Sequence, residues 1–378
     1  MKENKIQFHT LDALRFFAFL KVYLLHVPLQ GNFPVFSFLK SGGGFGVSFF
    51  FVLSGFLITY LLSAEKKNTG QINLKKFFLR RSFRIWPLYF LILIIIFLLP
   101  FGFKEQAGLH ITGGYNPDWK YSFSFLENYV MLYKDCYPIT TPLSIFWSLC
   151  IEEHFYIVWM LLVFFIPFKK IHYFLITAIV LSWVARYAEP CVFQDTLIRS
   201  NDLFTNADFF ASGGILGYLV ARNYESISGL SSKIVPPVKY SLILFIILIL
   251  IFHEYVLPGT QNIFYIINPT LIAILFAMLI FILIPQDSKI RIGKKNILSY
   301  LGRISYGLYV YHLIFIHITF QYFINHKIIL DDWGTLSLYI LITFGGTVLL
   351  SMISFHFFEK PFLQLREKIF KSRVAASS

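Results

Sequence analysis

A histidine and a pair of glutamates stand inside apolar stretches, where ionisable side chains are costly and usually functional. His26 closes the run LDALRFFAFLKVYLLH, and Glu152 and Glu153 lie within PLSIFWSLCIEEHFYIVW. A histidine can act as a general base, and a carboxylate beside it can fix its tautomer. If two helices bring His26 and Glu152 to one depth, the pair could take a proton from a hydroxyl. The structural alternative is a Glu–His pair that only locks two helices together.

A cation precedes the histidine in the same run. Arg15 and His26 are eleven residues apart, almost three helical turns, so they share one face about 16 Å apart along the axis. Each also has an ordinary explanation, because an arginine can extend its charged group to the membrane surface and a histidine can be satisfied within a core.

Hydroxyl groups and a second histidine accompany these residues. Ser148 lies one helical turn before Glu152 and on its face, and in the run 298–322 Tyr309 and His312 share a face. The hydroxyls of Ser148 and Tyr309 are candidate donors to an oxyanion. His312 is either a further functional group or a core histidine, and packing is the ordinary role of such tyrosines.

Three arginines close a basic loop expected at residues 64–85. Arg80, Arg81 and Arg84 stand at the mouth of the next apolar run, in the sequence RRSFRIWPLY. Arginine binds phosphate through two parallel hydrogen bonds, so the cluster is suited to a phosphate-bearing ligand. Positively charged loops are also ordinary on the cytoplasmic side of membrane proteins.

The elements that must position these groups are transmembrane helices. The 378 residues are 57% hydrophobic and only 14% charged, too little charge for the surface of a soluble domain of this size. The sequence predicts an all-α, polytopic membrane bundle of about ten helices in one domain, 1–378. The expected spans are 10–29, 44–63, 86–103, 146–167, 171–187, 204–221, 239–257, 264–285, 298–322 and 335–358.

The distribution of basic residues supports this topology. With both termini cytoplasmic, 23 of the 33 lysines and arginines fall in inside segments and 7 in outside segments. The net charge of +13 is therefore explained by the membrane topology, and no nucleic-acid partner is expected. Three cysteines give no metal-ligand spacing, so no metal is expected.

Six motifs occur in order along the chain: Arg15-x10-His26, FFFVLSGFLI at 49–58, RRSFRIWPLY at 80–89, WSLCIEEHFY at 147–156, SYGLYVYH at 305–312 and FFEKPF at 357–362. Together they resemble the acyltransferase-3 family of membrane O-acyltransferases, which modify bacterial surface sugars. An R-x-D pattern of that family is met only loosely, by Arg199 and Asp202.

The resemblance implies transfer of an acyl group, usually acetyl, from acyl-CoA to a hydroxyl of a glycan or other acceptor. It implies essential roles for Arg15 and His26, a role for Glu152 beside them, and a place in the bacterial cytoplasmic (inner) membrane. A proton-coupled transporter or flippase is the alternative, because intramembrane Arg, Glu and His would serve it equally well. The acceptor, the acyl chain and the oligomeric state stay open.

Overall fold

The computed structural model describes residues 8–193, 201–252, 263–285 and 292–375, and within these ranges the regular secondary structure is helical. The first half contains α1 (His9–His26), α2 (Pro34–Lys40), α3 (Phe45–Thr69), α4 (Leu74–Leu98), α5 (Phe101–Gln106), α6 (Trp119–Phe123), α7 (Glu127–Lys134), η1 (Thr141–Ile145), α8 (Phe146–Phe165) and η2 (Phe168–Lys170). The second half contains α9 (Ile171–Phe193), α10 (Ala207–Arg222), α11 (Tyr224–Lys233), α12 (Pro236–Ile251), α14 (Ile263–Leu283), α15 (Ile297–Arg303), α16 (Ser305–Asn325), α17 (Trp333–Ser354), the π-helical turn η3 (Phe355–Glu359) and α18 (Lys360–Ala375). Arg199 lies outside the described residues.

A helix occupies each of the ten predicted spans, but fewer helices are long and apolar enough to cross a membrane. Seven meet both requirements in the described ranges, or eight if α11 and α12, which meet at 94°, form one broken span. The number ten is therefore not confirmed. The helix α1 carries Asp12, Arg15 and Lys21 within 18 residues, and α10 has only 16 residues. The longest of these seven helical segments, 333–370, has 38 residues. Its helix is about 57 Å long, nearly twice the thickness of the hydrocarbon layer.

The expected basic loop at 64–85 is mostly helical, which corrects the prediction. The helix α3 runs on to Thr69 and ends at Gly70, whose φ of 74° is the left-handed conformation that favours glycine. Asn73 then caps α4, because its side chain accepts a hydrogen bond from the Lys76 amide at 2.8 Å. The three arginines consequently stand on the first turns of α4 instead of in a loop.

The helix α3 is the centre of the bundle and packs against α1, α8, α10 and α14. Its contact with α10 is close enough to require glycine on both sides. A Cβ atom on Gly55 would lie 2.0 Å from the carbonyl oxygen of Phe210, and one on Gly213 would lie 1.9 Å from that of Val52. Small residues therefore bring the two backbones together.

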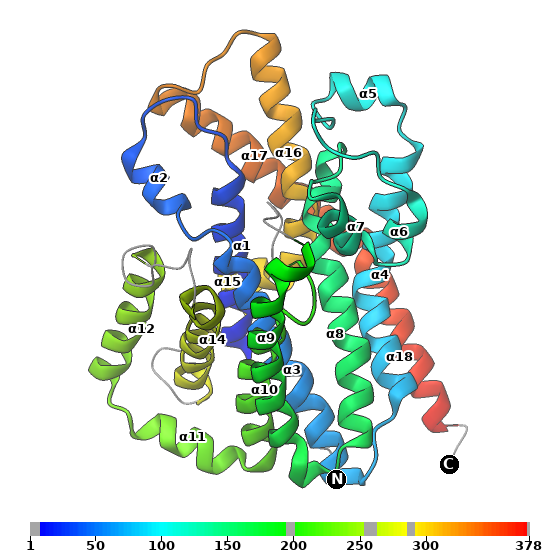
Figure 1. Cartoon of the computed structure of the whole chain (residues 1–378), viewed down its shortest axis with the longest axis vertical. Coiled ribbons are helices and arrows are strands. Elements are labelled where there is room, and N and C mark those ends of the chain that lie inside the picture. The colour runs from blue at the N-terminus through cyan, green and yellow to red at the C-terminus, as the bar shows by residue number, and fades with distance from the viewer. Residues whose placement is uncertain (1–7, 194–200, 253–262, 286–291, 376–378) are drawn as a thin grey trace.

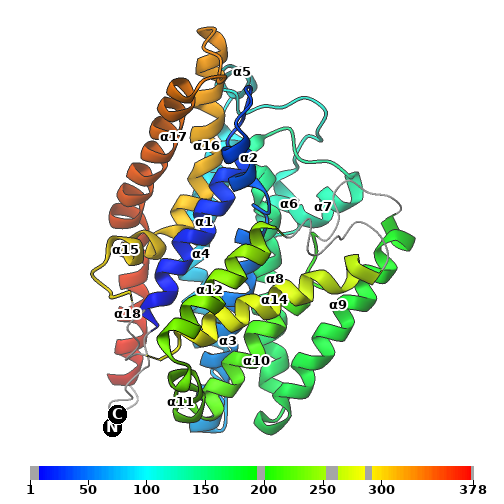
Figure 2. The same ribbon diagram turned by 90° about the vertical axis from the view of Figure 1, so that its left-hand side faces the viewer.

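The ends of the helices sort into two ends of the molecule (Figures 1 and 2). The start of α1, the end of α3, η2, α11 and the end of α18 lie at one end, and α2, α5 and the turn between α16 and α17 lie at the other. Lys66 at the end of α3 donates hydrogen bonds to three carbonyl groups at the end of α8, Val163, Phe164 and Ile166. The alternation agrees with the predicted topology, and the orientation relative to the membrane stays a prediction. We call these ends inner and outer.

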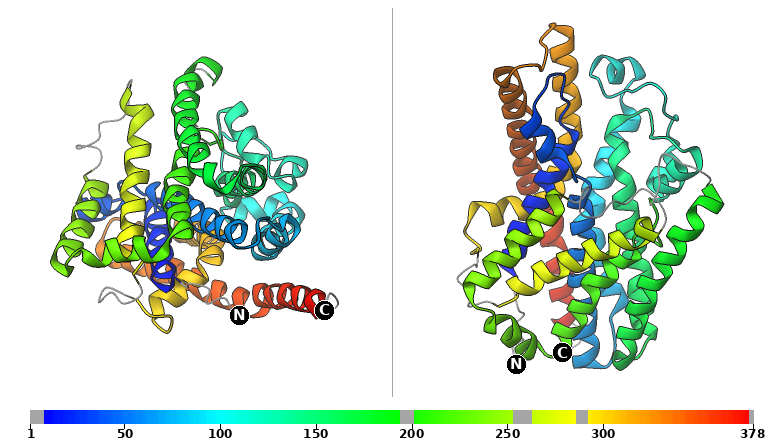
Figure 3. Two further views of the ribbon diagram at one scale, coloured as in Figure 1. Left: turned by 90° about the horizontal axis from the view of Figure 1, so that it is seen from below. Right: turned by 60° about the vertical axis from the view of Figure 1, so that its left-hand side comes forward.

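The bundle has two flanks and an outer lobe. The helices α17 and α18 cover the flank opposite α9 (Figure 3). At the outer end, α5, α6 and α7 and their connections form a lobe beside the tops of α4 and α8 (Figure 1). Within this lobe, α7 packs against α8.

Candidate active site

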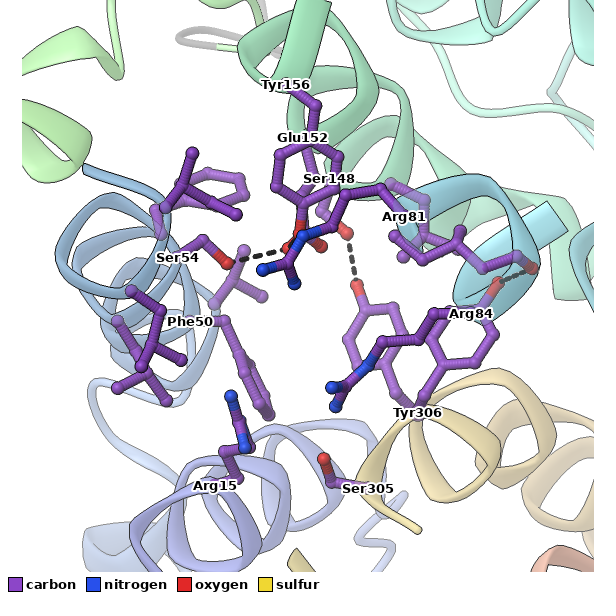
Figure 4. A pocket seen from close by; sticks show the side chains of 18 residues that line it. Arg15, Phe50, Ser54, Arg81, Arg84, Ser148, Glu152, Tyr156, Ser305 and Tyr306 are labelled. Carbon is purple, nitrogen blue, oxygen red and sulfur yellow. Dashed lines mark hydrogen bonds between the residues drawn. The ribbon is translucent and has the colours of Figure 1, made fainter. Parts of the chain in front are cut away.

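Five helices, α1, α3, α4, α8 and α16, enclose a cavity that we call the inner cavity (Figure 4). It collects most of the polar residues that the sequence singled out. The guanidinium groups of Arg15, Arg81 and Arg84 point into the same space. The polar residues that line it are Arg15, Ser54, Arg81, Arg84, Ser148, Glu152, Tyr156, Ser305, Tyr306 and Tyr309.

The inner cavity is rich in positive charge. Arg15 pairs with Asp12 at 2.6 Å, one turn earlier on α1. Arg81 lies over the ring of Tyr156, with 5.6 Å between its guanidinium carbon and the ring centroid. Within the described part of the chain, neither Arg81 nor Arg84 forms an ion pair shorter than 4 Å. An anionic ligand would therefore find two guanidinium groups whose charge is not already neutralised by direct contact.

Arg80 does not share this position. Its guanidinium carbon lies 5.5 Å from the ring centroid of Phe370 on α18, and Arg80 is not part of the cavity lining. The helix geometry alone does not cause this, because Arg84 lies about 40° around α4 from Arg80 and about 60° from Arg81. The contact with Phe370 of α18 is what separates Arg80 from the other two arginines.

Glu152 lies in the wall of the inner cavity and is held by two hydroxyl groups. Ser54 of α3 donates a hydrogen bond to its Oε1 atom at 2.7 Å, and Tyr156, one turn further along α8, donates to the same oxygen. The expected hydrogen bond between Glu152 and His26 is absent from the described residues. Glu152 projects from α8 toward α3, and the His26 ring has other partners.

His26 lines a second cavity of about 310 Å³, which we call the outer cavity. Arg15 lies in the first half of α1 and His26 at its last residue, so the two cavities are stacked along α1. The outer cavity is lined by Val22, Leu25, His26, Gly43, Gly44, Val47, Ile111, Tyr137, Thr141, Ser144, Ile145, Trp147, Tyr309 and His317. Part of its wall, Ile111 to Ser144, comes from the outer lobe.

His26 is paired with the fully buried His312. The His312 Nδ1 atom lies 2.5 Å from the carbonyl oxygen of Tyr309, and its Nε2 atom lies 3.2 Å from the Nδ1 atom of His26. The His26 Nδ1 atom is also 2.9 Å from the carbonyl oxygen of Val22. A carbonyl oxygen only accepts, so the facing Nδ1 atom of each ring carries the proton. His26 therefore keeps a free lone pair on Nε2, as a general base requires.

Tyr309 separates the two cavities and lines both of them, together with Val47. Its hydroxyl lies 2.6 Å from the Ser148 hydroxyl and donates to the carbonyl oxygen of Ile145 at 3.2 Å. Both hydroxyls are buried. The structure thus brings Ser148, Tyr309 and His312, the three candidates for substrate or oxyanion contacts, close to the boundary between the cavities.

The comparisons with known proteins identify the family. The family model described as acyltransferase domain, that of the acyltransferase-3 proteins, matches residues 8–355. The chain belongs to this acyltransferase family. The resemblance seen in the sequence motifs is thereby confirmed.

The relatives of this acyltransferase are bacterial. A Staphylococcus aureus (strain COL) protein named "Putative O-acetyltransferase" is 27% identical over 379 residues, which cover 93% of this chain and 56% of that protein. The peptidoglycan O-acetyltransferase OatA of Listeria monocytogenes is 32% identical over 155 residues, which cover 40% of this chain and 23% of that protein. The chain thus spans about half the length of the first relative. No solved structure matches.

Several residues of the candidate site were not expected from the sequence. Ser54 was not singled out as a site residue, yet its hydroxyl binds Glu152 and faces the inner cavity. His317, five residues after His312, lines the outer cavity with His26. The position of His317 in an apolar run was a usable signal, because a histidine inside a span is a candidate functional residue by default. Within the described residues, no cluster of three or more His, Cys, Asp or Glu side chains is arranged to hold a metal.

Proposed function

We propose that this acyltransferase transfers an acyl group, acetyl, from acyl-CoA at the inner end to a hydroxyl group of a glycan at the outer end. One observation carries the proposal. The cationic inner cavity and the histidine-lined outer cavity meet at a common wall, made by Tyr309 and Val47. A donor entering one cavity and an acceptor entering the other would therefore meet at that wall.

The inner cavity suits the donor. Phosphate groups of acyl-CoA would pair with Arg81 and Arg84 at the start of α4, and with Arg15. Arg80 takes no part in this donor site, because it lies over Phe370. The extended arm of the donor would pass along the apolar lining of α3 and place its thioester beside Tyr309.

The outer cavity suits the chemistry. The acceptor hydroxyl oxygen attacks the thioester carbonyl carbon, and the Nε2 atom of His26 takes the hydroxyl proton. The carbon–sulfur bond then breaks, the thiolate leaves with that proton as the thiol, and the ester remains on the acceptor. His312 acts as a positioning residue, because it accepts from Nδ1–H of His26 and so keeps the Nε2 lone pair available.

The hydroxyl pair at the wall would stabilise the oxyanion. The Tyr309 and Ser148 hydroxyls are buried and 2.6 Å apart, and a thioester carbonyl would stand beside them. Both now donate to the Ile145 carbonyl oxygen, at 3.2 Å and 3.0 Å, so a hydroxyl would turn its proton to the oxyanion when the thioester arrives. Glu152 has a different role from the one expected. We assign it to the inner cavity, where its bonds with Ser54 and Tyr156 fix the ring on which Arg81 lies.

Family membership favours acyl transfer over the transporter alternative, and the relatives indicate the kind of acceptor. OatA of Listeria monocytogenes is named a peptidoglycan O-acetyltransferase. A polysaccharide hydroxyl at the outer face is accordingly the acceptor we propose for this chain.

The test is acetyl transfer by the purified protein in lipid nanodiscs, with radiolabelled acetyl-CoA and a soluble saccharide. We expect labelled saccharide with the wild type and a loss of about a hundredfold or more in His26→Ala, the usual worth of a general base. The matched control is His326→Ala, because His326 is exposed at the far end of α16. Full activity in His26→Ala would refute the role of the base, and absence of labelled saccharide with the wild type would refute acetyl-CoA as the donor.

A further inference from the structure

The outer lobe contains a groove that the proposed chemistry does not use. Two hollows lie side by side on it, of about 530 Å³ and about 640 Å³, within the size range of small-molecule sites, roughly 300–1,000 Å³. Asn116 and Asp118 line both hollows, so they form one continuous groove. We call it the lobe groove.

Aromatic rings dominate the lobe groove, and they are open to solvent. Tyr133 is 81% exposed, Trp119 is 58% exposed and Tyr121 is 47% exposed. All three line the groove, and its polar side chains include Lys104 and Lys134. Flat rings interleaved with amide, carboxylate and ammonium groups are amphipathic in the same way as a saccharide, which has apolar C–H faces and hydroxyl edges. The C–H groups of a sugar are attracted to the negative face of an aromatic ring.

The floor of the groove is fixed in place. Glu127 is 1% exposed and accepts hydrogen bonds from the hydroxyls of Tyr115 and Ser122. Asp118 caps α6 through the Lys120 amide at 2.9 Å. Tyr115 is further paired with Tyr137, whose carbonyl oxygen accepts from the Tyr115 amide at 3.2 Å. A groove built on such a scaffold keeps its shape before a ligand arrives, which lowers the cost of binding.

The lobe groove adjoins the outer cavity. Thr140 lines the groove, and the next residue, Thr141, lines the outer cavity with His26. Tyr137 lines the outer cavity and is hydrogen bonded to Tyr115, which lines the groove. A strand seated in the groove would therefore lie beside the cavity that holds the candidate base.

We propose that the lobe groove binds an extended saccharide strand, whose sugar rings stack on Trp119, Tyr121 and Tyr133, and that it delivers the acceptor hydroxyl to the outer cavity. This inference rests on the proposed function for the delivery step, but the binding itself is independent of it. A lipid surface is the competing occupant, because tyrosine and tryptophan gather at membrane interfaces. The concave shape favours the saccharide, whereas charge does not separate the two occupants, because Lys104 and Lys134 line the groove beside Asp118.

The experiment is calorimetric titration of the purified protein in phosphatidylglycerol-containing nanodiscs with a hexamer of β-1,4-linked N-acetylglucosamine. We expect saturable binding by the wild type, weakened about threefold to tenfold by Trp119→Ala or Tyr133→Ala, the worth of one aromatic contact. Tyr133→Phe keeps the ring and should bind like the wild type. Tyr187→Ala is the matched control, because Tyr187 is 74% exposed on α9 and does not line the groove.

The outcomes separate this inference from the proposed function. His26→Ala should bind the hexamer as the wild type does. Binding of the hexamer by the wild type without any acetyl transfer would refute the chemistry and leave the groove supported. Absence of binding by the wild type would overturn the groove. Binding by Trp119→Ala and Tyr133→Ala that is as tight as that of the wild type would also overturn it. Fluorescence that is quenched by brominated lipid in the wild type and not in Trp119→Phe would place Trp119 in the membrane and would also overturn it.

Discussion

His26 and His312 form a pair of rings from two different helices, with 3.2 Å between the Nδ1 atom of His26 and the Nε2 atom of His312. The Tyr309 carbonyl oxygen fixes the proton on the far nitrogen of His312. The pair therefore determines which nitrogen of His26 is free, a role that a carboxylate was expected to fill.

The first prediction concerns this pair. His312→Ala removes the acceptor for His26 and should lower kcat by about tenfold, the worth of one hydrogen bond. His312→Gln, which restores an acceptor, should recover part of that loss. The measurement is kcat for acetyl transfer with donor and acceptor at saturation. If His312→Ala left kcat unchanged while His26→Ala abolished it, His312 would be a packing residue only.

The second prediction separates three neighbouring arginines. Arg81→Ala and Arg84→Ala should each raise KM for acetyl-CoA about tenfold or more, because each removes a charge-assisted hydrogen bond to phosphate. Arg80→Ala is the control on the same helix, since Arg80 lies over Phe370, and its KM should stay near the wild-type value. Equal effects of all three substitutions would indicate a general surface charge effect and not a donor site.

The third prediction concerns the wall between the cavities. Tyr309→Phe removes a hydroxyl that lies 2.6 Å from Ser148 but keeps the ring in place. We expect kcat to fall by about a hundredfold, as when one oxyanion donor is removed, with little change in KM for either substrate. Tyr311→Phe is a matched control, because its hydroxyl bonds to Ser354. A change confined to KM for acetyl-CoA would assign Tyr309 to donor binding.

The fourth prediction concerns pH and the outer lobe. Burial raises the pKa of the Glu127 carboxyl above its usual range, and the Asp118 carboxylate raises it further, although hydrogen bonds from Ser122 and Tyr115 act in the opposite direction. The folded state thus binds this proton more tightly than the unfolded state. The resulting stability is present below the pKa that the Glu127 carboxyl has in the unfolded state. It is lost as the pH rises through the pKa of that carboxyl in the folded state.

Glu127→Gln mimics the protonated carboxyl at every pH. Its melting temperature should match the wild type near pH 4 and exceed it increasingly toward pH 8, as measured by thermal scanning in detergent. Glu105→Gln, at an exposed position of the same lobe, should follow the wild type throughout. Parallel curves for the wild type and Glu127→Gln would contradict the raised pKa.

The sequence predicted the helices better than the contacts between them. Hydropathy and the distribution of lysine and arginine located a helix in every predicted span, because insertion of a helix into a membrane depends on its own composition. The extent of α4 was missed, since the basic stretch that looked like a loop is a helix capped by Asn73. Periodicity on that helix would not have separated Arg80 from the other two, because Arg84 is closer in angle to Arg80 than to Arg81, and the contact of Arg80 with Phe370 comes from α18.

The pairing of His26 was not predictable from one chain. The sequence suggested Glu152 as its partner, and only the packing of α1 against α16 brings the His312 ring to within hydrogen-bonding distance. The position of Glu152 depends in turn on α3, which places Ser54 against it. The rotation of a helix about its axis depends on the helices that pack against it. The residue spacing within one helix does not determine that rotation.

The most direct test of the account uses sealed inside-out membrane vesicles that contain the protein, with the saccharide hexamer trapped inside and labelled acetyl-CoA added outside. If the donor occupies the cationic inner cavity and the acceptor the histidine-lined outer cavity, the trapped hexamer becomes labelled, and His26→Ala vesicles give none. Labelling of the hexamer only when both substrates are on the same side, or equal labelling by His26→Ala, would contradict the account.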